Sequence, residues 1–270
     1  MSTPLHIATD NGHYNAVVLL LEAGANVNNR DDIGFKPIHL ASANDHRLIV
    51  NELLKYGTMI NTATLDIEYD YCSDDTPLHL AALNNHDELA LTLIQRGASI
   101  NRRNSWRQTP LHLAVMAESC SIIKLLLKHG ANIHLKDSPL DCDADELSPL
   151  GHAMLSKQYG ERMVRLMLRY RKSKRDVRNA IILAVRYDNI AVCEYLLNRK
   201  KANPNTIDTG GNSLLHIAMS RSTPSYDMIK LLIGKGAIRD LKDSRGRTPI
   251  QLLDKDIVKI IKALLLGYAD

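Results

Sequence analysis

Eleven histidines and four cysteines are the side chains of this 270-residue chain best suited to metal binding and proton transfer. The cysteines, Cys72, Cys120, Cys142 and Cys193, form no Cys-x-x-Cys pair and are too few for a disulfide scaffold, so they indicate a reducing compartment. Most histidines recur at a regular interval. Successive copies therefore lie one interval apart instead of around one metal or substrate, which favours a structural role.

Two short motifs only partly match known ligand sites. Residues 141–146, Asp-Cys-Asp-Ala-Asp-Glu, begin like a calcium loop of EF-hand type, but Glu146 and His152 stand where Gly and Glu are required. The stretch favours a solvated acidic loop. Residues 234–236, Gly-Lys-Gly, follow a helical pattern instead of a strand, and Arg239 stands at the third glycine of a dinucleotide fingerprint. They are expected to end a helix.

Motifs that define common catalytic sites are missing from the sequence: there is no Gly-x-Ser-x-Gly, His-Glu-x-x-His or P-loop. We therefore expect no enzymatic activity, no cofactor, no metal and no small-molecule substrate.

A repeated motif organises the whole chain. Thr3-Pro4-Leu5-His6 recurs fully or in part at intervals of 31 to 40 residues. The repeats begin near residues 3, 36, 76, 109, 148, 179 and 213, and a short final unit begins near 247. Because a fixed period of this length is typical of repeat architectures, each unit is one structural element that packs only on its neighbours.

The motif has a mechanism at both ends of each unit. Thr supplies a side-chain oxygen that caps a helix, and Pro fits the first helical turn, where its missing N–H is not needed. Gly24, Gly57, Gly97 and Gly130 each lie 20 residues after the motif Pro and follow an apolar run. Glycine is the usual residue just past a helix. Each unit therefore predicts a short helix, a turn, a second helix and an extended loop.

These residues resemble the ankyrin repeat, whose period is 33 and whose signature is Thr-Pro-Leu-His-x-Ala. The resemblance covers essentially residues 1–270 and implies a single all-α ankyrin-repeat solenoid, in which helix-turn-helix units stack and carry β-hairpin-like loops. It implies that the motif histidines tie neighbouring loops together. It also implies a protein partner that binds the hairpin tips and the concave face of the first helices.

Some units depart from this pattern. The fifth has Arg171 where the closing glycine is expected, and the sixth lacks Thr-Pro and carries Lys200-Lys201. The first helices and loops supply apolar or large side chains that we predict at a partner interface. Trp106, at a predicted hairpin tip, either contacts a partner or folds back onto its own hairpin. The other candidates are Ile33, Phe35, Leu83, Gln108 and Met116.

The two longest intervals contain acidic insertions in the inter-repeat loop. The first carries Asp74 and Asp75 together with the candidate contacts Asp66, Glu68, Tyr69 and Tyr71. The second carries the candidate contacts Asp141, Asp143 and Asp145. Loops tolerate insertions, so drift is one reading. Two acidic insertions at the same structural position also suit a binding face.

The net charge of +4 conceals an uneven distribution. Residues 1–150 carry 11 basic and 19 acidic side chains, a charge of −8, and residues 151–270 carry 23 and 11, a charge of +12. In a linear stack this predicts an acidic end and a basic end. The basic candidates are Arg162, Arg165, Arg169, Arg171, Lys172, Lys174 and Arg175. A solvated face is favoured, then an acidic protein partner. Nucleic-acid binding is a further alternative with few aromatics to support it.

A second class of function is a substrate role. The resemblance places Asn28, Asn61 and Asn101 at the hairpin position that asparaginyl hydroxylases modify in animal ankyrin domains. The acidic residue usual two places earlier is replaced by Asn26, Met59 and Ser99, which weakens this alternative.

Composition supports a folded chain: 45% of the residues are hydrophobic and 24% are charged. No window approaches 18 consecutive apolar residues, and the start lacks a basic and then apolar region, so we expect neither membrane insertion nor a signal peptide. We expect a cytoplasmic monomer, with nuclear import through Arg169–Arg175 as an alternative. Family members of this size act as transcription-factor inhibitors, adaptors, ligase substrate receptors or effectors delivered into host cells.

Overall fold

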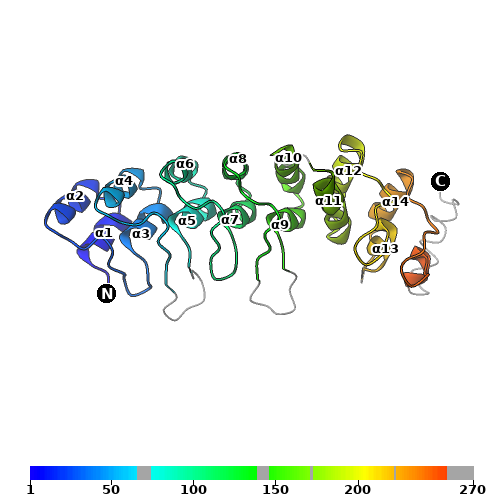
Figure 1. Cartoon of the computed structure of the whole chain (residues 1–270), viewed down its shortest axis with the longest axis horizontal. Helices are drawn as coiled ribbons and strands as arrows, with labels where there is room; N and C mark the ends of the chain where they lie inside the picture. Colours follow the sequence, from blue (N-terminus) through cyan, green and yellow to red (C-terminus); the bar gives the residue numbers. More distant parts are fainter. Residues whose placement is uncertain (66–73, 139–145, 171–172, 222, 254–270) are drawn as a thin grey trace. The chain divides into compact units, whose positions relative to one another are not determined.

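The computed structural model describes residues 1–65, 74–138, 146–170, 173–221 and 223–253 (Figure 1). Tertiary contacts divide the chain into two units, Met1–His152 and Ala153–Asp270. Within the described residues the regular structure is helical, and the one β pairing is an isolated antiparallel bridge between Ile207 and Ser213. The predicted all-α ankyrin fold is confirmed.

The first unit consists of helix pairs in chain order (Figure 1). Its helices are α1 (Pro4–Asp10), α2 (Tyr14–Glu22), α3 (Pro37–Ala43), α4 (Arg47–Lys55), α5 (Pro77–Leu83), α6 (Asp87–Gln95), α7 (Pro110–Met116) and α8 (Cys120–Lys128). Helix α9 (Pro149–Leu155) spans the unit boundary. The short first helices α1, α3, α5 and α7 pack on one another and form an inner row, and the second helices form an outer row.

The second unit contains α10 (Gly160–Tyr170), α11 (Lys174–Arg186), α12 (Ile190–Arg199), α13 (Leu214–Met219), α14 (Tyr226–Gly234) and the 3-10 helix η1 (Pro249–Leu252). Helix α11 packs on α12 and α13, and α12 packs on α14. Helix α11 has 13 residues, against seven in each inner helix of the first unit, because it begins six residues before the motif position near 180.

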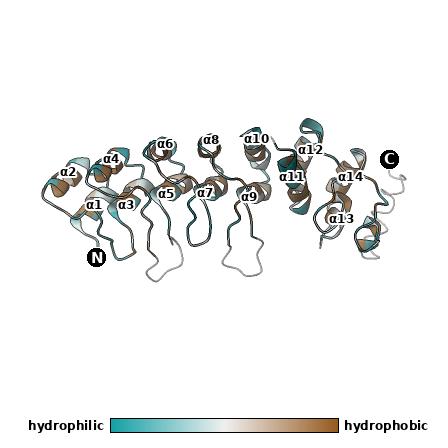
Figure 2. Cartoon of the chain, viewed as in Figure 1, coloured by the Kyte–Doolittle hydropathy of each residue, from teal (hydrophilic) through white to brown (hydrophobic). Residues whose placement is uncertain are grey.

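The repeated residues produce these elements as expected. Pro begins each inner helix of the first unit, and Thr3 caps α1 by accepting a hydrogen bond from the His6 backbone N–H. The second residue of each inner helix is buried: Leu5, Ile38, Leu78 and Leu111 are at most 1% exposed. The largest fully buried side chains are all Leu or Ile. The core is therefore aliphatic, and hydrophobic residues lie mainly on the helices (Figure 2).

Candidate interaction surface

Motif histidines in five of the repeats join each of these repeats to the loop that follows it. The Nδ1 atom of His79 accepts a hydrogen bond from the Thr76 backbone N–H at 3.2 Å, so Nε2 carries the proton and donates to the backbone oxygen of Gln108 at 3.2 Å. Four further histidines make the same bond to the following loop. The acceptors are Phe35 for His6, Thr62 for His39, Leu147 for His112 and Arg247 for His216. The structural role predicted for these histidines is confirmed.

Burial keeps several of these rings neutral. Desolvation lowers the pKa of His39, His79 and His112 to about 4. A neutral ring suits its position, since Nδ1 must accept a hydrogen bond. In the described part of the chain, no three His, Cys, Asp or Glu side chains are grouped so that they could hold a metal ion.

One loop device was not foreseen from the sequence. In six loops, two residues on opposite sides of the loop share two hydrogen bonds. The backbone N–H of the first residue donates to the backbone oxygen of the second, and the side-chain oxygen of the first accepts the backbone N–H of the second. We call this arrangement a loop clasp. The clasp pairs are Asp31–Phe35, Thr64–Asp75, Asn104–Gln108, Asp137–Leu147, Asp208–Asn212 and Asp243–Arg247. In the sequence, an Asp or Asn five residues before the motif, as at Asp31, Asn104, Asp208 and Asp243, was the available signal.

Two candidate contacts occupy matching positions on neighbouring inner helices. Leu83 is the last residue of α5 and Met116 the last of α7, and these helices pack on each other. Leu83 is 43% exposed and Met116 is 51% exposed. Gln108 is buried, and its Nε2 lies 3.8 Å from the Met116 sulfur, so the buried amide contacts the exposed side chain. We call Leu83 and Met116 the inner-helix surface.

The loop candidates differ in exposure. Ile33 is exposed in the Asp31–Phe35 loop, and Trp106 is half-buried in the Asn104–Gln108 loop. The backbone oxygen of Trp106 accepts a hydrogen bond from the Ser138 N–H at 2.8 Å, which links two successive loops. Phe35 packs edge-on against the His39 ring at a centroid distance of 5.8 Å. Phe35 and Gln108 therefore have structural contacts of their own.

Most candidates in the acidic insertions lie outside the described residues: Asp66, Glu68, Tyr69, Tyr71, Asp141, Asp143 and Asp145. Asp75 is described, and it is buried instead of presented to a partner. Burial raises its pKa to about 6, against the lowering effect of a hydrogen bond from Asn104 Nδ2 at 2.9 Å. Asp75 thus belongs to the loop structure, and the acidic face has to rest on other residues.

His152 has an unexpected partner. Its Nε2 lies 2.6 Å from Asp137 Oδ2, and its ring meets the His112 ring edge-on at 5.8 Å. Burial acts to raise the pKa of Asp137, but the hydrogen bonds from His152 and the Leu147 N–H outweigh it and lower that pKa. Asp137 therefore closes its loop and anchors α9 through His152. His152 replaces no motif histidine, so periodicity gave no signal for it.

The basic candidates lie on two helices of the second unit. Arg162, Arg165 and Arg169 are exposed on α10, and Lys174 and Arg175 are exposed at the start of α11. Arg171 and Lys172 lie outside the described residues. Arg165 is paired with Glu161 at 2.6 Å, and its guanidinium lies 5.1 Å from the centre of the Tyr195 ring. These contacts engage Arg165 within the fold.

The hairpin asparagines have different surroundings. Asn61 Oδ1 accepts a hydrogen bond from the Ser99 N–H, and Asn101 Oδ1 accepts one from the Asn132 N–H, both at 2.8 Å. Asn205, which sequence inspection missed, does the same with the Ile238 N–H at 2.8 Å. Asn28 is exposed and accepts from Lys36 Nζ at 3.3 Å. Hydroxylation stays a prediction; Asn28 and Asn101 are exposed, and Asn61 is half-buried.

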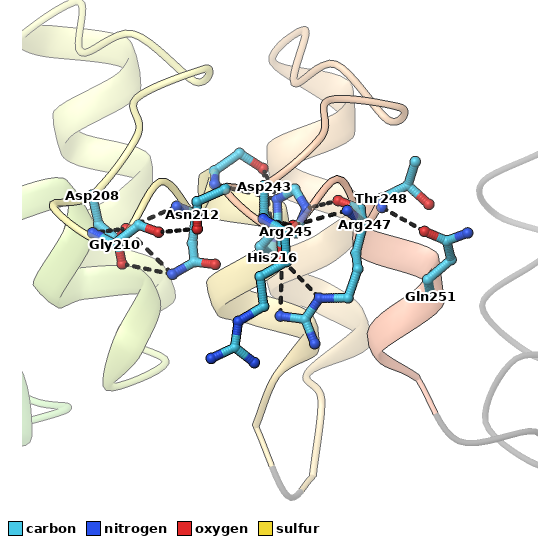
Figure 3. A network of polar contacts seen from close by, with 11 residues as sticks. Asp208, Gly210, Asn212, His216, Asp243, Arg245, Arg247, Thr248 and Gln251 are labelled. Carbon is cyan, nitrogen blue, oxygen red and sulfur yellow. Dashed lines mark hydrogen bonds and ion pairs between the residues drawn. The ribbon is translucent and has the colours of Figure 1, made fainter.

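The second unit presents a polar surface. A groove of about 640 Å³ is lined by arginines from an inner helix and its neighbouring loops: Arg186, Arg221, Arg245 and Arg247. Arg247 pairs with Asp243 through Nε at 2.9 Å and Nη2 at 2.8 Å (Figure 3). Asp208 and Asp243, the acidic lining residues, accept backbone N–H groups in their loop clasps. The groove therefore presents more positive than negative charge.

Comparisons with known proteins agree with this fold. A family model for ankyrin repeats in three copies matches residues 1–64 and 61–137, and one for ankyrin repeats in many copies matches residues 180–233. The chain belongs to the ankyrin-repeat family. It is 43% identical over 78 residues to a Rickettsia bellii (strain RML369-C) protein named for its ankyrin repeats. That match covers 28% of this chain and 31% of the relative.

Family membership carries a general expectation about activity. Ankyrin repeats are in general protein–protein interaction modules without catalytic function. No helix in the described ranges combines the length and apolar character needed to cross a membrane.

Proposed function

We propose that the chain is a non-enzymatic adaptor whose protein partner binds the inner-helix surface of Leu83 and Met116, with Ile33 and Trp106 adding contacts from the loops. The carrying observation is the matched exposure of two large apolar side chains on adjacent helices. Burying such side chains in an interface contributes about 25 cal/mol for each Å² removed from water. The histidine bonds and loop clasps hold these side chains in place, so little ordering is needed on binding.

We infer the cellular setting of this adaptor from other residues. Cys120 and Cys193 are free thiols, which supports the predicted reducing compartment and a cytoplasmic location. A monomer is the expected form. The basic groove of the second unit supports an additional acidic contact, which would steer the partner during encounter.

The test compares three forms of the full chain as affinity baits in a lysate of the expressing cells: wild type, Leu83→Asp/Met116→Asp, and Leu48→Asp. Leu48 is 68% exposed on the outer helix α4, so its variant introduces one aspartate, against two in the double variant, away from the proposed surface. A partner retained by wild type and Leu48→Asp but lost from the double variant supports the proposal. The partner is then purified, and its Kd for the double variant should be about tenfold or more above its Kd for wild type.

Equal recovery by all three forms would show that the partner binds elsewhere. Circular dichroism and urea unfolding of each variant confirm that the fold is retained. Trp106→Ala separates the loop contribution, since Trp106 lies outside the inner-helix surface.

A further inference from the structure

A second pocket in the second unit has a uniform charge. It has a volume of about 660 Å³ and lies between the first turns of α11 and the loop that follows α12. Its charged lining residues are Lys174, Arg178, Lys200 and Lys201, and its described lining contains no carboxylate. We call these four residues the basic pocket.

The charges of this pocket are not neutralised within the described structure. Arg178 donates from Nη2 to the backbone oxygen of Ile207 at 2.7 Å, a contact that fixes its side chain without cancelling its charge. Lys174, Lys200 and Lys201 form no ion pair with any described carboxylate. Lys200 is half-buried, and the other three are exposed. Four like charges around one pocket repel one another, so an anionic ligand would relieve that repulsion.

The backbone at Lys201 adds an independent observation. Lys201 has φ +51, in the left-handed region, directly after the C-cap residue of α12. Five other repeats place a glycine at this point with φ between 85 and 92: Gly24, Gly57, Gly97, Gly130 and Gly236. The helix end is closed in a related way with one extra residue: Ala202 N–H donates to Leu196 O, six residues back, at 3.0 Å, whereas Ala98 N–H donates to Leu93 O, five residues back, at 2.9 Å.

A lysine in this conformation costs the fold stability that glycine would not. Backbone strain of this kind is enriched at functional sites, and Lys201 is one of seven non-glycine residues with positive φ in the described structure. The Lys201 side chain lines the basic pocket and adds a positive charge to it, which a glycine at this position would not do. Strain and charge therefore coincide at one residue.

The remaining lining narrows the class of ligand. Val177, Ala202 and Ile207 provide aliphatic surface beside the cations, and Ile207 is 41% exposed. No aromatic ring is among the described lining residues, so a nucleic-acid base would find nothing to stack on. An acidic peptide with an aliphatic side chain matches both the charge and the apolar part.

We propose that the basic pocket binds an acidic peptide segment of a partner protein through Lys174, Arg178, Lys200 and Lys201, with an aliphatic side chain of that segment against Ile207. This inference rests on the proposed protein-binding function and adds to it a second contact on other residues.

The experiment uses the full chain and a fluorescein-labelled peptide of sequence Gly-Glu-Leu-Asp-Glu-Leu-Asp-Gly, followed by fluorescence anisotropy at 50 mM and 300 mM NaCl. Lys201→Gly should weaken binding about threefold, the size of one partly exposed ion pair. Lys200→Glu/Lys201→Glu should weaken it about tenfold or more. Lys201→Gly should also unfold at a urea concentration equal to or above that of wild type, which separates lost binding from lost folding.

Lys235→Glu is the control for reversal of one lysine charge at a helix C-cap. Lys235 is the C-cap residue of α14, as Lys200 is of α12, with the same φ of −96, and it lies outside the pocket. Its variant should keep the wild-type affinity within twofold. Leu83→Asp/Met116→Asp should bind the peptide normally, so a failure of the basic pocket and a failure of the inner-helix surface are distinguishable.

Three results would overturn the proposal. Unchanged affinity in Lys201→Gly would show that the strained backbone at Lys201 is tolerated and that its side chain has no role in peptide binding. Equal weakening by Lys235→Glu would show a general electrostatic attraction instead of a pocket. Tighter binding of an oligothymidylate of equal charge than of the peptide would assign the pocket to nucleic acid.

Discussion

His79 Nε2 donates a hydrogen bond to the backbone oxygen of Gln108, 29 residues further along the chain, and thereby holds the backbone of the residue whose buried side chain contacts Met116. The core of one repeat is thus linked to the exposed surface of the next. The link depends on a neutral imidazole, because Nδ1 accepts the Thr76 N–H. Protonation of the ring would remove that acceptor.

Acid should therefore destabilise the first unit. His39, His79 and His112 have pKa values of about 4 when folded, below the ordinary value of 6.5, so the unfolded chain binds more protons between these limits. Stability is then fully present above pH 6.5 and is lost as the pH falls toward 4, by up to about 1.4 kcal/mol per pH unit for each histidine. Urea unfolding at a series of pH values, followed by Trp106 fluorescence, measures this loss of stability. A stability that stays constant from pH 7 to 4.5 would contradict this.

Asp75 should act in the opposite direction. Its folded pKa of about 6 lies above the ordinary 3.8, so its ionisation costs stability as the pH rises through 6. Asp75→Asn removes that cost and should raise the free energy of unfolding at pH 7.5 by about 1–3 kcal/mol. The difference from wild type should vanish near pH 4. The exposed Asp32→Asn is the control, and a pH-independent gain in Asp75→Asn would argue against the burial of a charge.

Gly34 and Arg107 occupy equivalent loop positions, and we expect Gly34→Ala to lower the stability of the fold and Arg107→Gly to raise it. Gly34 has φ +81, and a Cβ there would meet the backbone oxygen of Leu65. Gly34→Ala should therefore cost about 2 kcal/mol or more. Arg107 occupies the corresponding place with φ +57, so Arg107→Gly should gain up to about 1 kcal/mol. Thermal unfolding of both variants checks the pair; a loss of stability in Arg107→Gly would show that its 3.7 Å pairing with Glu146 outweighs the strain.

The contact of Asp137 with His152 predicts an asymmetry among the clasps. Asp137→Ala removes the side-chain bond of a loop clasp and the carboxylate that receives His152, whereas Asp31→Ala removes the side-chain bond of a loop clasp and the acceptor of the Ile33 N–H. We expect a loss of about 3 kcal/mol in the first case and about 1–2 kcal/mol in the second. Unfolding midpoints for the two variants measure the difference. Equal losses would mean that His152 contributes nothing to the first unit.

The sequence predicted the features that local chemistry determines. Pro at the start of an inner helix and Gly past an outer helix act within one or two turns, so Pro77 and Gly97 could be interpreted directly. Leu83 and Met116 could also be placed, since the last residue of a seven-residue helix follows from its start. Features that depend on distant partners were missed: the burial of Asp75, the Asp137–His152 contact and the pocket around Lys201 each arise from residues that packing brings together.

Because of the loop clasps, the length of a loop can change without a change in how its ends are held. Asp31 and Phe35 are four residues apart, and Asp137 and Leu147 are ten apart, yet both pairs close with the same two backbone N–H groups. Thr64 and Asp75 close a still longer interval in the same way. A clasp thus fixes the two ends of a loop, and segments of different length can be inserted between them. Foreign epitopes or affinity tags placed between Leu65 and Asp74 should be displayed without redesign of the scaffold beneath them.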